Sequence, residues 1–287
     1  MKAKQTLECV ERWRHWKVPI RQSLKDEDER EDPDCLATAT VSSVQSNPNH
    51  RAYMRANLHV SIEKWYHGFR ELYGALRYMS YASGVDFVVA HGSLIGWAFQ
   101  KCMLPYDDDG DFQIVGNLQI QKYEAWLATL RTSTGPPENK EYSADQHWLS
   151  LCIPDRGIPG CSNFTVYVDL GRDSHIESRL LYLPTGVYVD ITYLYESCDY
   201  LHSKTKFNPL MMTLKTKILS TTRTKQLTHT YNTMDIWPLK TCRFCGFEFS
   251  CPHNVNQVLN QEYSKWSNTR YKDFTFDGTC WRNSLNS

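Results

Sequence analysis

Four aspartates fall within residues 105–111, whose sequence is PYDDDGD. Asp109 and Asp111 come at the start of a predicted strand, where residues two apart project from the same face. Two carboxylates held so close repel each other unless a cation neutralises them. Mg²⁺ is the natural candidate, because this hard cation prefers oxygen ligands. The alternative is an inert Asp-rich turn. Asp107 and Asp108 are interpreted as outer-shell acids or as solvated turn residues, the second being favoured.

A Gly-Ser turn precedes this acidic segment. The sequence His91-Gly92-Ser93 follows a predicted buried strand at residues 85–90 and leads into a short helical stretch at residues 97–99. Backbone N–H groups near a helix start can cradle a phosphate. His91 at the end of the strand either contacts a bound donor or is a hydrogen-bonded structural residue.

A further acid lies inside an apolar strand. Asp190 is flanked by Val189 and Ile191 within the predicted strand at residues 187–194. A buried carboxylate requires a partner, because an unpaired charge in a core is strongly disfavoured. A metal or a substrate hydroxyl could supply that partner. The alternative is a structural role, in which Asp190 pairs with an arginine or caps a neighbouring backbone.

The elements that must position these residues follow from hydrophobic periodicity. Apolar residues at spacings of three and four predict helices over residues 60–83 and 120–130. Shorter runs predict strands at residues 112–114, 164–170 and 180–183, with a tight hairpin turn at Pro184-Thr185-Gly186 before the strand at 187–194. Beyond residue 197 the sequence is polar, with helical character in places. These patterns predict a mixed α/β or α+β domain over residues 51–275, after a polar segment at 1–50 and before a tail at 276–287.

Composition excludes several classes of function. The chain has 287 residues with 32 Lys+Arg and 32 Asp+Glu, so no net charge attracts it to nucleic acid. No apolar stretch is long enough to predict a membrane span. The N-terminus lacks the apolar region of a secretory signal. Ten cysteines and the glycosylation triplet at Asn163 nevertheless favour a disulfide-bonded glycoprotein of the secretory lumen over a cytoplasmic protein with free thiols.

A cysteine cluster lies near the C-terminus in a part predicted to be irregular. Cys242, Cys245 and Cys251 could bind zinc together with His253 or Cys280. Because no second C-x-x-C follows at a typical spacing, disulfides are favoured over zinc.

Several blocks in the same order resemble the LicD/fukutin family of nucleotidyltransferase-fold proteins. They are the strand with Gly92-Ser93, the segment 105–111, the strand with Asp190, and flanking blocks at 179–192 and 235–266. The similarity covers about residues 58–266 and is greater to the eukaryotic branch, which includes fungal mannosylphosphate-transfer and fukutin-related proteins. Gly110 stands where the family usually has a β-branched residue, and a glycine there offers no side chain to pack.

This resemblance implies a nucleotidyltransferase-like mixed sheet flanked by helices, and a metal-dependent phosphotransferase of the Golgi or secretory lumen. The enzyme would move phosphoribitol, phosphocholine or mannose phosphate from a CDP- or GDP-linked donor to a glycan hydroxyl. Asp109 and Asp111 would hold Mg²⁺ or Mn²⁺, and residues 91–93 would bind the donor phosphates. Asp190 would complete the metal shell or accept the proton of the acceptor.

Two other functions fit the same residues. A glycosyltransferase would bind a sugar nucleotide through the D-x-D sequence and Mn²⁺. A catalytically inactive family member would serve as a binding or scaffold subunit. A phosphodiester-linked product would indicate the phosphotransferase, whereas a plain glycoside would indicate the glycosyltransferase.

Overall fold

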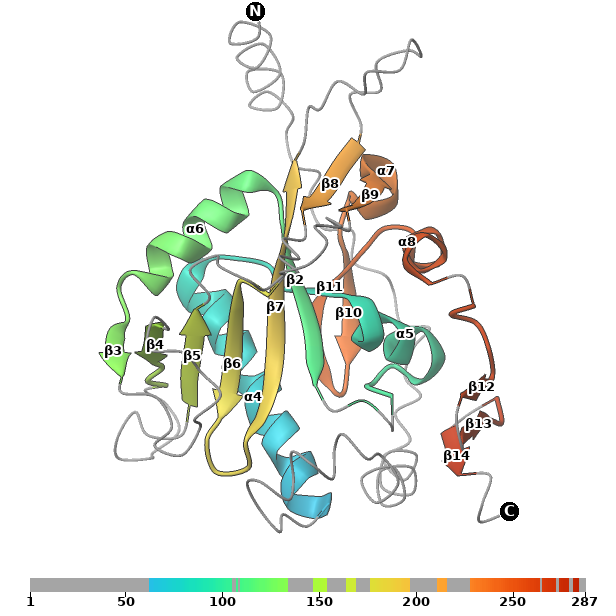
Figure 1. Cartoon of the computed structure of the whole chain (residues 1–287), viewed down its shortest axis with the longest axis horizontal. Coiled ribbons are helices and arrows are strands. Elements are labelled where there is room, and N and C mark those ends of the chain that lie inside the picture. The colour runs from blue at the N-terminus through green and yellow to red at the C-terminus, as the bar shows by residue number, and fades with distance from the viewer. Residues whose placement is uncertain are drawn as a thin grey trace, which may run out of the picture.

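The protein has a mixed α/β architecture in a computed structural model of the chain (Figure 1). The structure describes residues 62–104, 107, 109–133, 147–153, 164–168, 176–196, 211–215, 228–263, 265–271, 274–278 and 281–283. The predicted polar segment at residues 1–50 lies outside these ranges. No helix in the described ranges is both long and apolar enough to cross a bilayer.

A large mixed sheet organises the described part of the chain. Its main strands follow the order β10-β11-β1-β2-β7-β6-β5-β4-β3. In that order they span Lys240–Phe244, Phe247–Cys251, Val88–Val89, Gly110–Val115, Val187–Glu196, Ser178–Tyr182, Phe164–Val168, His147–Ser150 and Arg131–Ser133. Strand β8 (Met211–Lys215) pairs with the end of β7 and with β9 (Thr228–Asn232). The long strands β2 and β7 are parallel neighbours at the centre of the sheet.

Helix α4 (Ile62–Ser83) covers one face of the sheet, as the periodicity predicts. Its apolar stripe is buried, including Phe69, Leu72, Leu76 and Met79. The Tyr73 ring contacts Phe112 of β2, with ring centroids 6.1 Å apart. The helix ends at Ser83, and Gly84 follows it with a φ of +66°, a conformation that favours glycine. Figure 1 shows α4 passing behind β6 and β7.

Helix α6 (Asn117–Leu127) lies on the same face and confirms the second predicted helix. Its buried Tyr123 shares a 2.9 Å hydrogen bond with Ser178 of β6 and contacts Tyr193 of β7. Phe112 of β2 contacts Tyr73 of α4 and Tyr193 of β7 contacts Tyr123 of α6, so both lie on the helix-covered face, and successive residues of a strand face opposite ways. Asp111 and Asp190 therefore project from the other face.

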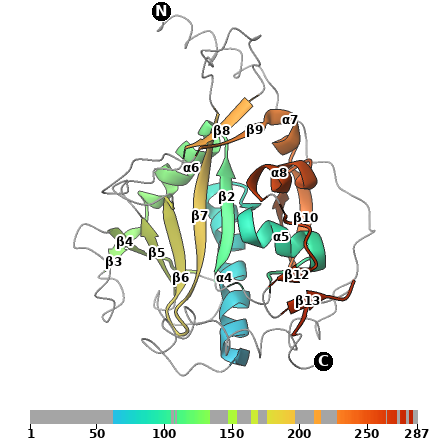
Figure 2. The ribbon, with the colours of Figure 1, turned by 45° about the vertical axis from the view of Figure 1, so that its right-hand side comes forward.

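Helices α5 (His91–Gln100) and α8 (Val255–Glu262) contact each other near β2 and β10 (Figure 2). Helix α5 begins at His91, so the Gly-Ser turn forms its first turn rather than a separate loop. Residues 131–133, for which the sequence predicts no strand, form β3. The polar region beyond residue 197 contributes β8, β9 and the short helix α7 (Thr233–Ile236). Propensity missed these strands because their stability depends on neighbouring strands.

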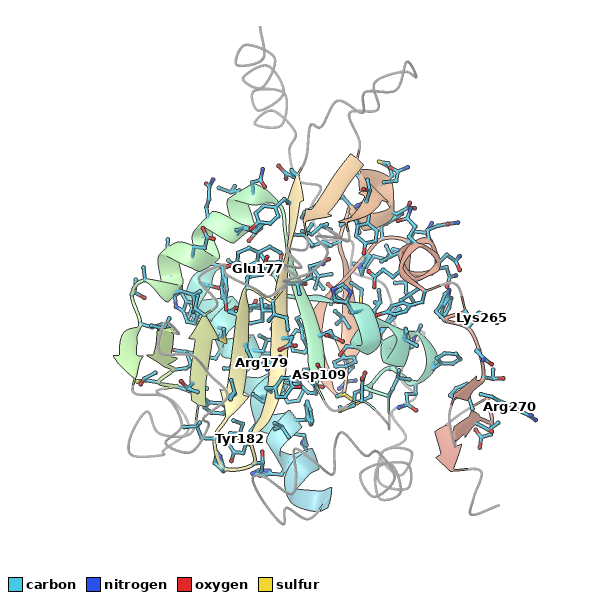
Figure 3. The ribbon with its side chains drawn as sticks, viewed as in Figure 1. Asp109, Glu177, Arg179, Tyr182, Lys265 and Arg270 are labelled. Atoms are coloured by element: carbon cyan, nitrogen blue, oxygen red, sulfur yellow. A yellow bond between two sulfur atoms is a disulfide. The ribbon has the colours of Figure 1, made fainter. Side chains whose placement is uncertain are left out.

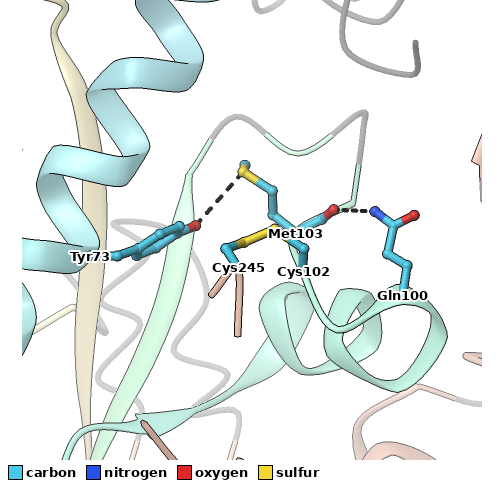
Figure 4. Close-up of a disulfide and its surroundings, with 5 residues drawn as sticks. All are labelled: Tyr73, Gln100, Cys102, Met103 and Cys245. Atoms are coloured by element: carbon cyan, nitrogen blue, oxygen red, sulfur yellow. Dashed lines mark hydrogen bonds between the residues drawn. A yellow bond between two sulfur atoms is a disulfide. The ribbon is translucent and has the colours of Figure 1, made fainter. Parts of the chain in front are cut away.

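The Cys-containing C-terminal part, predicted to be irregular, forms the regular hairpin β10–β11. Disulfides join Cys242 to Cys251 across the hairpin, and Cys245 in its turn to Cys102 after α5 (Figure 4). A small sheet of β12 (Arg270–Tyr271), β13 (Phe274–Phe276) and β14 (Trp281–Asn283) follows. Its Phe276 ring lies 4.9 Å from that of Phe99 in α5. The described residues of the predicted tail at 276–287 thus include the last residue of β13 and all of β14.

Candidate functional site

The central pair of parallel strands brings two acids together. In the register of β2 and β7, Asp111 lies directly opposite Asp190. Neighbouring strands are about 4.8 Å apart, and paired residues point to the same face. The two carboxylates therefore share the face of the sheet that α4 does not cover. Asp109 lies in a bend just before β2, at the start of this face (Figure 3).

The Gly-Ser turn holds Asp111. The Gly92 N–H donates to Asp111 Oδ2 at 3.1 Å, and the Asp111 N–H donates to Ser93 Oγ at 2.9 Å. Ser93 is completely buried. A carboxylate at the first turn of α5 is stabilised by the free backbone N–H groups and the helix dipole. The turn proposed from the sequence as a phosphate cradle thus binds an anionic side chain of the protein itself.

Asp107 joins this group. A Cβ atom on Gly92 would lie 2.8 Å from Asp107 Oδ2 and 3.1 Å from Asp111 Oδ2, so only glycine lets both carboxylates approach the helix start. The Asp107 Oδ2 atom is buried. The favoured interpretation of Asp107 as a solvated turn residue is therefore wrong, because the chain folds this turn back onto α5. Asp108 lies outside the described residues.

Packing explains why residue 110 is a glycine. A Cβ atom there would lie 3.0 Å from Val189 Cγ2 and 3.5 Å from the Tyr73 ring on the helix-covered face. The space that a side chain at residue 110 would occupy is filled by Tyr73 of α4. Gly110 thus lets a large aromatic ring pack on the opposite face of the sheet from Asp111, the acidic residue of β2.

Arg179 of β6 pairs with Asp190. Its Nε donates to Asp190 Oδ1 at 2.5 Å and its Nη2 to Oδ2 at 2.9 Å, a bidentate geometry. The guanidinium also lies 4.0 Å over the Tyr188 ring. Asp190 is 5% exposed and the Arg179 side chain is 19% exposed, so a buried carboxylate pairs with a partly buried guanidinium. The structure thus contains the arginine pairing that the sequence left as an alternative for Asp190.

The partner of Asp190 could have been predicted from the register of the hairpin at residues 180–194, although residue types alone did not identify Arg179. The turn at Pro184-Thr185-Gly186 closes the hairpin at Tyr182 and Val187. Counting three residues back and three forward from that pair places Arg179 opposite Asp190. An opposite-charge pair directly across a predicted hairpin is a recognisable pattern.

His91 is tied to the C-terminal helix. Its Nδ1–H donates to Glu262 Oε2 at 2.9 Å, and the other oxygen of Glu262 accepts a 2.5 Å hydrogen bond from the Tyr231 hydroxyl. The His91 Nε2 lies 3.5 Å from Thr192 Oγ1, two residues along β7 from Asp190. His91 has a φ of 45°. Sequence reasoning missed Glu262, Tyr231 and Thr192, because no local pattern links residues so far apart in the chain.

These contacts shift two pKa values. Burial lowers the pKa of His91, but Glu262, Asp111 and Asp190 raise it more, to about 9, so the ring carries a positive charge near neutral pH. Burial also raises the pKa of Asp111 to about 6, against the opposing effect of His91 and with a further rise from Asp190. Negative charge on Asp111 is thus costly in this environment, and a bound cation would reduce that cost.

The donor chemistry at Gly92 suits a hard divalent cation. The Asp107 and Asp111 carboxylates converge there, and oxygen ligands are those that Mg²⁺ prefers. In the part of the chain that the structure describes, no three His, Cys, Asp or Glu side chains form a ready-made metal cage. Mg²⁺ often uses one or two carboxylates plus substrate phosphates and water, so these residues fit such an ion.

The cysteine cluster is disulfide-bonded. Cys242 and Cys245 belong to different disulfides, and Cys251 completes the first of them. The disulfide interpretation is therefore confirmed for these three cysteines. Zinc binds thiolates, so the zinc alternative would require both bonds to be reduced.

Comparison with known proteins leaves the family open. No protein-family model matches the chain, and no curated protein sequence matches it either.

Proposed function

We propose that this protein is a metal-dependent phosphotransferase of the LicD/fukutin type, with a nucleotidyltransferase-like sheet. It moves a phosphorylated alcohol or sugar from a CDP- or GDP-linked donor to a glycan hydroxyl. The observation that carries the proposal is the in-register pairing of Asp111 with Asp190 beside the first turn of α5, where the Gly92 N–H binds Asp111. Three separated sequence blocks thereby meet on one face of a sheet.

The acidic residues would hold the metal. Asp109 and Asp111 would bind Mg²⁺ or Mn²⁺ together with the donor diphosphate, and Asp107 lies close enough to Gly92 to contribute an oxygen. An ion held there would neutralise charge on the donor diphosphate and so favour departure of the nucleoside monophosphate. The raised pKa of Asp111 supports this role, because a site built for a cation destabilises its carboxylates when the cation is absent.

The basic residues would bind phosphate oxygens. Arg179 is held in place by Asp190 and by the Tyr188 ring, so little conformational entropy would be lost when it contacts an anion. In this arrangement Asp190 acts mainly by positioning Arg179. His91 supplies a second positive charge on the same face.

Nucleotide release tests the proposal. The protein is incubated with CDP-ribitol, CDP-choline and GDP-mannose, a glycan acceptor and Mg²⁺ or Mn²⁺, and released CMP or GMP is measured. Asp111→Asn should lower metal-dependent release at least about 100-fold, while its circular dichroism spectrum stays unchanged. Glu248→Gln is the matched control, because Glu248 is an exposed acid on β11. Full activity in Asp111→Asn would refute the mechanism, and a glycosidic product would indicate a glycosyltransferase.

A second candidate is a catalytically inactive binding subunit. The observation that favours it is the Arg179–Asp190 ion pair, which supplies Asp190 with a protein cation in place of a metal. This candidate predicts donor binding without nucleotide release. Calorimetry with CDP or GDP and Mg²⁺, run beside the release assay, separates the two functions.

The disulfides support a place in the secretory lumen. Structural disulfides persist in oxidising compartments and are rare in the cytosol. Cys102–Cys245 and Cys242–Cys251 both secure the β10–β11 hairpin next to the site. A tagged full-length protein should therefore be found in the Golgi or secretory lumen by microscopy. Cytoplasmic staining with reduced thiols would contradict this location.

A further inference from the structure

The side chain of Glu262 joins two parts of the protein at the candidate site. Glu262 is the last residue of α8, and its side chain is 5% exposed. One oxygen accepts the His91 Nδ1–H at 2.9 Å and the other accepts the hydroxyl hydrogen of buried Tyr231. Both carboxylate oxygens are thus engaged, so Glu262 has a fixed orientation.

This contact fixes the direction of the histidine ring. With Nδ1 bound to Glu262, the opposite ring nitrogen, Nε2, faces Thr192 Oγ1 at 3.5 Å. Thr192 projects from the same face of β7 as Asp190, so Nε2 lies on the acidic face of the sheet. The His91 side chain keeps 20% of its surface exposed, which leaves it accessible to a ligand.

His91 has an unfavourable backbone conformation, which indicates that the surrounding contacts hold this residue in place. A φ of 45° is uncommon for a residue other than glycine, and such strain persists only where surrounding contacts enforce it. The neighbouring Gly92 N–H binds Asp111, so the same turn places the histidine ring and the acid together.

We propose that Glu262 is a positioning residue, assisted by Tyr231, which directs Nε2 of His91 at a phosphate oxygen of the donor bound by the acidic residues. This inference rests on the proposed phosphotransferase function. A histidine held by a carboxylate through one ring nitrogen presents the other in a defined direction. Without Glu262 the ring would be free to turn away from the diphosphate.

Kinetics and binding together test this role. The donor kcat/KM of the folded protein and the affinity for Mg²⁺-pyrophosphate by calorimetry are measured for His91→Ala, Glu262→Ala and the double variant. We expect each single variant to lose about 30-fold in kcat/KM, and the double variant to lose no more than the His91 variant. Glu262→Gln, which keeps an acceptor for Nδ1–H, should recover part of the loss.

Two conservative variants separate positioning from general packing. Tyr231→Phe removes one hydrogen bond to Glu262 and should cost about 3- to 10-fold. Tyr123→Phe removes a buried hydroxyl on the opposite face of the sheet and should leave kcat/KM unchanged. Gln261→Ala, an exposed neighbour of Glu262 in α8, is the surface control.

The outcomes distinguish this inference from the function on which it rests. A wild-type protein that binds no Mg²⁺-pyrophosphate and releases no nucleotide overturns both. An active wild type whose Glu262→Ala variant keeps full kcat/KM overturns the positioning role alone. Losses that multiply in the His91/Glu262 double variant overturn it as well, because they mean that the two side chains act independently.

Discussion

Arg179 and Asp190 form an ion pair in which the carboxylate is buried and the guanidinium is partly buried. The Asp190 carboxylate accepts two hydrogen bonds from one guanidinium and is almost fully buried. Removing one member of such a pair leaves an uncompensated charge, whereas replacing both with apolar residues avoids that cost. The pair is thus a strong constraint on single substitutions and a weak contributor to net stability.

We therefore expect Arg179→Met to destabilise the protein by about 3–5 kcal/mol, because it leaves the Asp190 charge buried without its partner. The double variant Arg179→Met/Asp190→Leu should recover most of that loss. Urea unfolding followed by tryptophan fluorescence measures both. Equal destabilisation of the single and double variants would contradict the buried-charge explanation.

Gly92→Ala tests the convergence of acids on the start of α5. The new methyl group would displace the Asp107 and Asp111 carboxylates, yet alanine is a better helix former than glycine. We expect Mn²⁺ affinity, titrated by electron paramagnetic resonance, to fall at least about 10-fold, with little change in Tm.

Gly96→Ala in the same helix is the matched contrast. A Cβ atom there would clash with the Cys102 carbonyl oxygen, which is backbone and cannot easily move. We expect this variant to have a lower Tm than the wild type, unlike Gly92→Ala. A Gly92 variant with unchanged Mn²⁺ binding would remove Asp107 and Asp111 from the proposed metal site.

Among the elements, α5 is fixed at both ends. The His91–Glu262 ion pair holds its first residue against α8, and the Cys102–Cys245 disulfide holds the chain just beyond its last turn against the β10–β11 hairpin. The Cys245 N–H also donates to the Lys101 carbonyl at 2.8 Å. Both attachments come from residues far along the chain, so α5 and its acidic neighbours are placed by the C-terminal part of the domain.

The ion pair between α5 and α8 predicts a pH dependence. Because the folded protein raises the pKa of His91 from 6.5 to about 9, the folded state binds this proton more tightly than the unfolded state. Its stabilisation is fully present below pH 6.5 and is lost as pH rises through about 9.

We expect the free energy of unfolding of the wild type to fall over this interval by an additional 1–3 kcal/mol, roughly, relative to Glu262→Gln. Urea unfolding at pH 6.5, 8 and 9.5 measures the difference, and groups common to both proteins cancel. Parallel pH profiles would show that Glu262 does not stabilise the charged imidazole.

On the scale of the whole molecule, the β10–β11 hairpin joins the sheet through the two-residue strand β1. The register between β1 and β11 contains one residue pair, Val88 with Ser250. The hydrogen bonding that attaches the hairpin is thus limited, and side-chain packing and the disulfide to Cys102 supply further attachment. Tyr73 of α4 contributes through its contacts with Phe244 and Phe249.

The two disulfides should therefore differ in their effect on stability. Cys102–Cys245 spans 143 residues and Cys242–Cys251 spans 9, for which the chain-entropy relation gives about 5 and about 2.5 kcal/mol. We expect Cys102→Ala/Cys245→Ala to lower the free energy of unfolding more than Cys242→Ala/Cys251→Ala. Denaturant titrations under non-reducing conditions measure both. The reverse order would mean that the local contacts of the Cys242–Cys251 disulfide in the folded hairpin outweigh the effect of loop closure.

Local sequence was sufficient for elements whose signals lie within a few residues. The period of Phe69, Leu72 and Leu76 determined α4, because a helix buries one stripe of its own side chains. The Pro-Thr-Gly turn determined the β6–β7 hairpin, and its register placed Arg179 opposite Asp190. Residue chemistry also identified Asp111 and Asp190 as acids that need partners.

Tertiary structure decided which distant residues meet. The parallel pairing of β2 with β7, the contact of Glu262 with His91 across 171 residues, and the disulfide partners have no local signal. Parallel strands are joined by long connections, so their register depends on how the whole sheet packs rather than on a turn. The position of Asp107 against Gly92 also depends on tertiary structure, because it results from the packing of this residue onto α5. The local sequence at residues 105–111 is typical of an exposed turn.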